Sequence, residues 1–284
     1  SSGGVTASAT GAIGDGWQFD GSSGYVELSD SDLSDFNFMH DGSPWSFSFW
    51  GKKDSSSEIG WIFSTANTNQ ATTETGIDFN FDSSNRLNIV VKNAGTSVIS
   101  VGNLNGIATD TAFHHYVITF DGSTTVTAYK DGSTFGSPPA ASGSFSSGDA
   151  EHLPLIGKRA DNSGTQFFDG TLDQILVYDD ELTQGEVTAL WNGGSGDTTP
   201  DTDNLKAWYN FEQTSTTLEN QATIPVSVDT IHKQLANPLI EDTYADVSDE
   251  WHHYAYTRDG TELLVYLDGV EIQSETILTT EGFG

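Results

Sequence analysis

Two His-His pairs, His114 with His115 and His252 with His253, are the first residues of the sequence that could do chemistry. Imidazole serves as a metal ligand or as a general acid and base. The residues around both pairs read as strands, so adjacent histidines point to opposite faces and cannot chelate one metal ion together. We therefore interpret these histidines as structural residues of a central strand.

The acidic residues offer carboxylates, but not in the pairing that glycosidic hydrolysis requires, with one carboxylate on each side of the scissile bond. Glu58 has no acidic residue two positions further on, and Glu241 and Asp242 are adjacent, hence on opposite faces of a strand. No nucleophile elbow, His-Glu-x-x-His helix or phosphate-binding loop is present. The sequence therefore predicts that the protein is not an enzyme.

Seven tryptophans raise the alternative of a sugar-stacking platform. Most of them lie in strand patterns, which favours packing in a core. Phe135 and Phe145 lie in a Ser-, Gly- and Pro-rich connection, residues 133–149, which is either a binding loop or a plain surface loop. The position of a sugar site stays open at this point.

The composition excludes several classes of function. The 284 residues include 10 Lys and Arg against 41 Asp and Glu, a net charge of −31. Such a chain is unsuited to binding nucleic acid phosphates or anionic membranes. The absence of cysteine excludes a disulfide scaffold and thiolate chemistry, and no apolar run is long enough to insert into a membrane. Calcium is an obvious partner for so many carboxylates, and a hydrated, non-adhesive surface is the other explanation.

The elements that position these residues are short strands. Alternating patterns predict strands at 45–50, 61–65, 77–81, 87–92, 113–120, 126–130, 166–178 and 205–212. The dipeptide Asp-Gly, a strong hairpin signal, recurs eight times. One short helix is expected at 183–191, with Thr183 and Glu186 as a capping box and Gly193 after its end. The sequence predicts an all-β protein built as an antiparallel sandwich or barrel.

An internal repeat divides the chain. Residues 113–132 (FHHYVITFDGSTTVTAYKDG) match residues 251–269 (WHHYAYTRDGTELLVYLDG) with one residue fewer. A repeat of this kind indicates a duplicated domain. The polar, Gly-rich segment 193–203 reads as a linker between a first domain, 1–192, and a partial second unit, 204–284.

Four segments resemble the laminin-G-like, concanavalin A-like jelly-roll domains of extracellular bacterial, archaeal and viral proteins. They are residues 19–27 (FDGSSGYVE), 45–50 (WSFSFW), the His-His hairpin at 113–132, and 168–179 (FDGTLDQILVYD) with the helix that follows. Each motif is modest alone, but the four occur in the order of the family. The resemblance covers most of residues 11–192 and implies an antiparallel jelly-roll β-sandwich.

The departures from the family pattern leave two alternatives. Such domains open with a strand like residues 205–212 (LKAWYNFE), which the first domain lacks, and the second unit lacks its middle and its end. Residues 223–247 match no part of the pattern. Either strand 205–212 completes the first sandwich beside its closing strand, or the chain is a slice of a longer tandem array. In the second case a neighbouring chain or residues beyond this sequence fill the gaps. We expect complementation, within the chain or between chains, because an open sheet edge promotes aggregation.

Calcium is implied by the resemblance, since in relatives an ion commonly ties the opening strands to the closing strand. The matching positions are Asp20 with Gly24 in the loop 21–24, and Asp169 or Asp173 on the closing strand. The alternative is that Asp20 and Asp169 are only Asp-Gly turn residues. A weaker, separate candidate is the acidic run 179–181.

The function expected from these observations is a non-catalytic module that binds a glycan or protein at the exterior of a cell or virion. A structural calcium ion is expected as its cofactor. One alternative is a structural or decoration subunit that self-assembles through a strand donated by a neighbouring chain. A glycoside hydrolase is the second alternative, disfavoured by the missing carboxylate pair.

Overall fold

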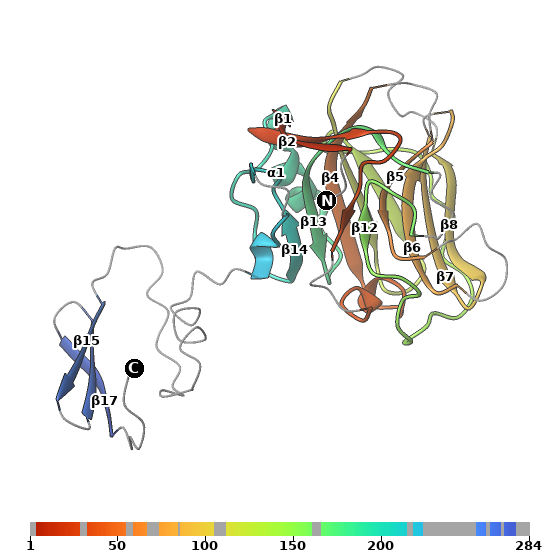
Figure 1. The fold of residues 1–284 in the computed structure, drawn as a ribbon. Helices are drawn as coiled ribbons and strands as arrows, with labels where there is room; N and C mark the ends of the chain where they lie inside the picture. Colours follow the sequence, from red (N-terminus) through yellow and green to blue (C-terminus); the bar gives the residue numbers. More distant parts are fainter. Residues whose placement is uncertain are drawn as a thin grey trace. The chain divides into compact units, whose positions relative to one another are not determined.

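The computed structural model describes residues 4–28, 33–54, 59–66, 74–84, 86–104, 112–160, 166–214 and 218–223, and the backbone of three strands between 254 and 276. The chain forms two compact units, Ser1–Thr223 and Ile224–Gly284 (Figure 1). His252, His253, Glu58, Glu241, Asp242 and the segment 224–247 lie outside the described residues.

One layer of the first unit is an eight-stranded antiparallel sheet (Figure 1). Its order is β1 (Val5–Thr10), β2 (Asp15–Asp20), β13 (Asp169–Tyr178), β4 (Trp45–Lys53), β9 (His114–Phe120), β10 (Val126–Lys130) and β11 (Ser133–Thr134). The eighth strand, β14 (Leu205–Tyr209), also pairs with β13. The first half of β13 therefore pairs with β2 and the second half with β14, while β4 runs along its other edge.

The other layer is a six-stranded antiparallel sheet. Its order is β3 (Val26–Glu27), β12 (Leu155–Ile156), β5 (Gly60–Ser64), β6 (Gly76–Phe81), β7 (Leu87–Asn93) and β8 (Thr96–Leu104). The jelly-roll β-sandwich predicted from the sequence is confirmed. The predicted strands have their counterparts in β4, β5, β6, β7, β9, β10, β13 and β14. In the first unit the additions are β1, β2, β8 and the two-residue strands.

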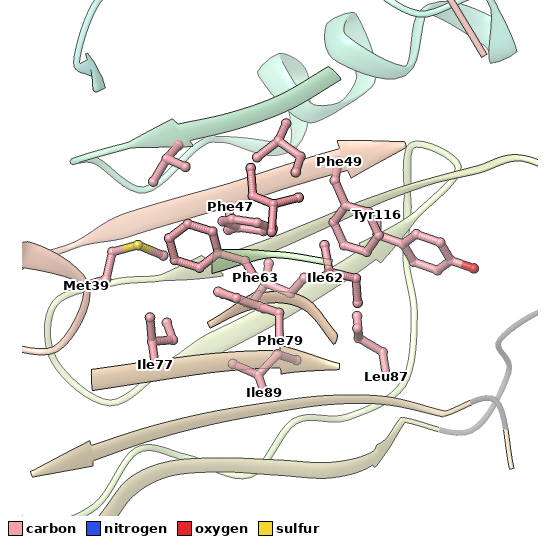
Figure 2. Packing of buried hydrophobic residues seen from close by; sticks show 14 of the residues in the cluster. Met39, Phe47, Phe49, Ile62, Phe63, Ile77, Phe79, Leu87, Ile89 and Tyr116 are labelled. Atoms are coloured by element: carbon pink, nitrogen blue, oxygen red, sulfur yellow. The ribbon is translucent and has the colours of Figure 1, made fainter. Parts of the chain in front are cut away.

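The core lies between the two sheets and is rich in aromatic rings (Figure 2). Phe47 from β4 and Phe79 from β6 stack face to face across the layers, with ring centroids 4.2 Å apart. Phe63 from β5 packs against both rings. Because strand side chains alternate, each buried aromatic residue places its sequence neighbours on the outer face of its sheet.

A second apolar cluster covers part of the outer face of the eight-stranded sheet. The helix α1 (Gln184–Trp191) contributes Val187 and Leu190, which pack with Val117 and Leu176 of the sheet. Thr183 is the N-cap, and its hydroxyl and the Glu186 carboxylate form the predicted capping box. Three short 3-10 turns complete the unit: η1 (Asn37–Met39), η2 (Asn192–Gly194) and η3 (Gln221–Thr223).

The first unit ends at Thr223 rather than at the boundary of 192 predicted from the sequence. The reason is that β14 lies in the same sheet as β13, so residues 193–203 connect two strands of one sandwich. The outer edge of β14 is capped by a side chain, because Asn220 accepts from Trp208 N at 2.8 Å and donates to Lys206 O at 3.0 Å. Of the two alternatives for strand 205–212, the structure shows the first, because β14 pairs with β13 of the same chain.

The second unit contains a three-stranded antiparallel sheet of β15 (Tyr254–Asp259), β16 (Glu262–Leu267) and β17 (Val270–Thr276). The hairpin β15–β16 is the repeat of β9–β10. Among the described strands β15 pairs with β16 alone, whereas β9 pairs with both β10 and β4. No helix among the described residues is long and apolar enough to cross a membrane.

Candidate functional site

Polar side chains cover the outer face of the six-stranded sheet. In β6, Ile77, Phe79 and Phe81 belong to the core, so Asp78 and Asn80 project from the opposite face. By the same alternation β7 contributes Asn88 and Lys92. In β5 the alternation is interrupted by an irregularity between Trp61 and Phe63, so Ile62 and Phe63 both lie in the core and β5 contributes Trp61 and Ser64. We call this set the polar face: Trp61, Ser64, Asp78, Asn80, Asn88 and Lys92.

Asp78 is held in one position on the polar face. It lies opposite Ser64 in the β5–β6 register, and both side chains are fully buried. The Ser64 hydroxyl donates to Asp78 Oδ1 and accepts from Ala160 N at 2.8 Å. Because Asp78 and Ser64 are fully buried, these hydrogen bonds fix β5 and β6 to each other and to the backbone at Ala160.

A cross-strand row runs over the polar face. Trp61 on β5 pairs with Asn80 on β6, and Asn80 pairs with Asn88 on β7. Gly102 on β8 follows, because a Cβ built at Gly102 has only Asn88 Oδ1 within 4 Å, at 3.8 Å. At the other end the Arg159 guanidinium lies over the Trp61 ring, 5.3 Å from its centroid. The row combines an aromatic ring with two carboxamides, each of which both donates and accepts hydrogen bonds.

The structure brings three of the four predicted metal ligands together. Asp20 and Asp169 face each other in the β2–β13 register, and Gly24 closes the loop that begins at Asp20. Asp20 Oδ1 accepts from the backbone N–H groups of Ser22, Ser23 and Gly24, and Oδ2 accepts from the two serine hydroxyls. Burial acts to raise the pKa of Asp20, but these hydrogen bonds outweigh it and hold the pKa well below its usual value.

Asp173, the fourth predicted ligand, belongs to a different environment. It lies four residues beyond Asp169 on β13, a distance of about 13 Å along a strand. Its side chain is fully buried, and Oδ2 accepts from Ile13 N at 2.8 Å. Burial, with a contribution from the charge of Glu212, raises the pKa of Asp173 to about 7 despite that hydrogen bond. One ion therefore does not contact both Asp169 and Asp173.

The donors around Asp20 do not fit a calcium site as they stand. Calcium takes six to eight oxygen ligands, whereas the Asp20 oxygens face N–H and O–H groups. Within the described part of the chain, no three His, Asp or Glu side chains are grouped to hold a metal ion. Calcium binding at Asp20, Gly24 and Asp169 stays a prediction, and it requires the loop to release some of these hydrogen bonds.

The described His-His pair is structural. His114 Nδ1 and Asp131 Oδ2 are 2.7 Å apart, and Asp131 Oδ1 accepts from His115 N at 3.1 Å. His115 Nε2 lies 2.8 Å from the Ser48 hydroxyl, and its ring stacks on Trp50. Burial lowers the pKa of His115 to about 4, so this imidazole is neutral at pH 7. The two rings lie on opposite faces of β9.

The sequence patterns did not predict the polar face. Its signal was the run GIDFNF at residues 76–81, in which polar residues occupy every second position of a strand. A strand with one face in the core and one in water gives the same alternation, so the pattern alone does not separate a site from a surface. The burial of Asp78 and Asn80, which sets them apart from an ordinary solvated face, depends on tertiary structure.

Comparison with known families gives one match. A family model described as the concanavalin A-like lectin/glucanases superfamily matches residues 20–188, more than half of the chain. This match begins at Asp20, the last residue of β2, extends through β13 and includes the whole polar face. No curated protein matches the chain.

Several solved structures are similar to part of the chain. The Ruminococcus gnavus IT-sialidase CBM40 bound to α2,3-sialyllactose has 12% identity and a TM-score of 0.48, over 63% of this chain and 98% of that chain. A putative carbohydrate binding protein from Bacteroides ovatus has 13% identity and a TM-score of 0.42, over 63% and 49%. The native heptameric SAP-like pentraxin from Limulus polyphemus has 15% identity and a TM-score of 0.34, over 52% and 70%. At this similarity no binding residue is transferred from these proteins.

Proposed function

Because this chain belongs to the concanavalin A-like lectin/glucanase superfamily, we propose that its first unit binds carbohydrate at the polar face and does not cleave it. The observation that carries the proposal is the row of Trp61, Asn80 and Asn88, three cross-strand neighbours on the outer face of one sheet. Carboxamides match hydroxyl groups, which also donate and accept. The Trp61 ring is buried beneath the Arg159 guanidinium, so it supports the row and is not a stacking surface for a sugar.

The carboxylates of the polar face support binding rather than hydrolysis. Glycosidases use two carboxylates on opposite sides of the scissile bond. On the outward positions described for β5 to β8 there is one carboxylate, that of Asp78, and it accepts a hydrogen bond from Ser64. A single carboxylate does not supply both an acid and a base.

The setting that we propose is the exterior of a cell or virion, where glycans are displayed. A net charge of −31 keeps the module hydrated, and salt screens the repulsion between like charges. In this setting recognition is the molecular activity of the first unit.

The experiment is a glycan array probed with the full chain and with Asn80→Ala. We expect wild type to bind a defined set of glycans, and we expect Asn80→Ala to lose that binding by about tenfold or more. Gln184→Ala is the matched control, because it removes a carboxamide that donates to Gly132 O from helix α1. Equal binding by Asn80→Ala, or release of reducing sugar by wild type, would contradict the proposal.

A second candidate function concerns the second unit. In the first unit β9 is flanked by β4, whereas β15 pairs with β16 alone among the described strands. A strand donated by a neighbouring chain at the other edge of β15 would make the protein a self-assembling surface subunit. Light scattering on the full chain over a range of concentrations tests this candidate, and a monomer at every concentration would exclude it.

A further inference from the structure

We infer that the turn between β1 and β2, residues 11–14, is a pH-sensitive latch on the outer face of the eight-stranded sheet. The uncharged carboxyl group of Asp173 lets the turn close over it, and ionisation of that group loosens the turn. The latch is separate from the proposed carbohydrate site, because the polar face belongs to the other sheet.

Asp173 is fixed in the strand from which it projects. Leu172, its neighbour in β13, belongs to the core, so Asp173 lies on the outer face of the sheet, opposite Trp50 of β4. Strand β13 pairs with β4 along one edge and with β2 and β14 along the other (Figure 1). A charge on Asp173 therefore reaches water only if the residues that cover it move.

The covering residues belong to the turn. The Asp173 side chain is fully buried, and Oδ2 accepts from Ile13 N at 2.8 Å. The turn comes so close to this carboxyl group that a Cβ built at Gly11 would lie 2.6 Å from Oδ2. Gly11 N donates to Gly14 O at 3.1 Å, and Gly14 is exposed. A short exposed turn is easier to displace than a strand paired along both edges, so the turn is the part that opens.

The surroundings of the Asp173 carboxyl group oppose a charge. The backbone N–H groups of Ile13, Gln174 and Ala12 favour the ionised form. Oδ1, however, is buried and has no hydrogen-bond partner in the part of the chain that the structure describes. Burial, with a contribution from the charge of Glu212, raises the pKa of Asp173 to about 7.

The carboxylates of the neighbouring segments add negative charge. Glu212, which follows β14, accepts from the backbone N–H of Asp15 at the start of β2, at 3.3 Å. The carbonyl oxygen of Asp197, in the connection 193–203, accepts from the side chain of the residue after Asp173. These three acidic residues come from three different segments around the turn.

The basic side chains on this face do not compensate the charge. Lys52 of β4 lies two residues beyond Trp50, and its ammonium group is 5.2 Å from the centroid of the Phe113 ring. His115 of β9 stacks on Trp50, and burial lowers its pKa to about 4, so it is neutral at pH 7. Within the described residues, ionised Asp173 has acidic neighbours and no ion-pair partner.

The opening of the turn should depend on pH within a defined range. In the open turn Asp173 is hydrated and titrates near its ordinary pKa of 3.8, whereas in the closed turn its pKa is about 7. The closed turn is therefore most stable below pH 4, and its stability is lost as the pH rises towards 7. The equilibrium shifts towards opening by about tenfold per pH unit in this range, on the order of 1000-fold in total, and then levels off.

The test is amide hydrogen exchange of the full chain from pH 4 to 8, corrected for the intrinsic exchange rate. For the Ile13 amide we expect protection to fall by about tenfold per pH unit up to pH 7 and then to stay constant. The amide of Val117, in the middle of β9, should be better protected than that of Ile13 at every pH, because only the turn opens.

Two variants identify the group responsible. In Asp173→Asn the protection of Ile13 should not depend on pH. Glu212→Gln keeps an acceptor for Asp15 N and removes the charge, so protection should level off at a lower pH than in wild type. Asp121→Asn is the matched control, because Asp121 accepts from Ser123 N in a different turn, and it should leave the pH dependence of Ile13 unchanged.

Three results would overturn the latch. The first is protection of Ile13 that does not change with pH in wild type. The second is equal protection of Ile13 and Val117 at every pH, which would mean that the turn opens only when the whole sandwich unfolds. The third is a pH dependence that persists in Asp173→Asn. The experiment uses no ligand, so its result is independent of the carbohydrate proposal.

Discussion

The backbone N–H of Ile13 donates to Asp173 Oδ2 at 2.8 Å, across 160 residues of sequence. This bond holds the turn between β1 and β2 against the closing strand β13. A second carboxylate acts on the same turn, because Glu212 accepts from Asp15 N at 3.3 Å. The β1–β2 hairpin is therefore attached to the sandwich by two acidic side chains, one from β13 and one from the segment that follows β14.

Asp173→Asn should stabilise the fold at alkaline pH. The pKa of Asp173 is raised from 3.8 to about 7, so its contribution to stability is fully present below pH 4 and is lost as the pH rises through 7. The loss is on the order of 4 kcal/mol at most. Asparagine keeps an acceptor for Ile13 and carries no charge, so the variant should exceed wild type in urea midpoint at pH 8 and match it at pH 4.

Asp121→Asn is the control, because the pKa of Asp121 is shifted in the opposite direction from that of Asp173. Burial acts to raise the pKa of Asp121, but hydrogen bonds from Thr125, Ser123 and Thr124 lower it overall. Its stabilisation is present above the unfolded pKa and is lost as the pH falls through the folded pKa. Asp121→Asn should therefore destabilise the fold at pH 8. If Asp173→Asn is also less stable than wild type at pH 8, the ionised Asp173 carboxylate does not destabilise the fold, and the prediction is wrong.

Asn220→Ala should loosen β14 and expose its edge. The substitution removes the acceptor for Trp208 N and the donor to Lys206 O, at a cost of about 1 to 3 kcal/mol. An uncapped strand edge also invites pairing between molecules. Denaturation and light scattering should show a lower midpoint and a mass that grows with concentration. Asn220→Asp, which keeps the acceptor, should lie between the variant and wild type.

Asp131→Ala should destabilise the first unit more than Asp131→Asn. Asp131 and Gly132 have φ values of 50° and 74°, the geometry of a type I′ hairpin turn, which alanine adopts with strain. Alanine also removes the acceptor for His114 and for His115 N, so the total cost is about 2 to 3 kcal/mol. Asparagine tolerates the turn and keeps one acceptor. Equal thermal midpoints for the two variants would contradict this role of the Asp131 side chain in the hairpin turn.

Removal of calcium tests the metal prediction. A site filled at 100 times its dissociation constant adds about 2.7 kcal/mol to stability. The calcium prediction requires the unfolding midpoint to fall when a chelator replaces calcium, whereas an unchanged midpoint would mean that the five hydrogen bonds to the Asp20 oxygens take the place of an ion. A large drop that Asp169→Asn abolishes would support a calcium ion between Asp20 and Asp169.

Local patterns in the sequence predicted the strands that carry strong alternation, such as β4 and β6, and the helix α1 with its capping box. The patterns were weak where side chains are small, so β1, with sequence VTASAT, was not expected. The membership of β14 in the first sandwich was one of two open alternatives, because strand pairing at long range is decided by the whole sheet. The burial that marks Asp78 and Asn80 also depends on residues far away in sequence, such as Ala160.

The long-range pairing of β2 has a consequence for the order of events during synthesis. Phe19 of β2 pairs with Gly170 of β13, which is made about 150 residues later. At roughly 5 to 20 residues per second, the first hairpin waits on the order of 10 to 30 s for its partner strand to be translated. Throughout that interval the nascent chain carries an uncovered Trp17 and Phe19. Strands β1 and β2 thus leave the ribosome before the rest of this sandwich and are among the last of its strands to become protected.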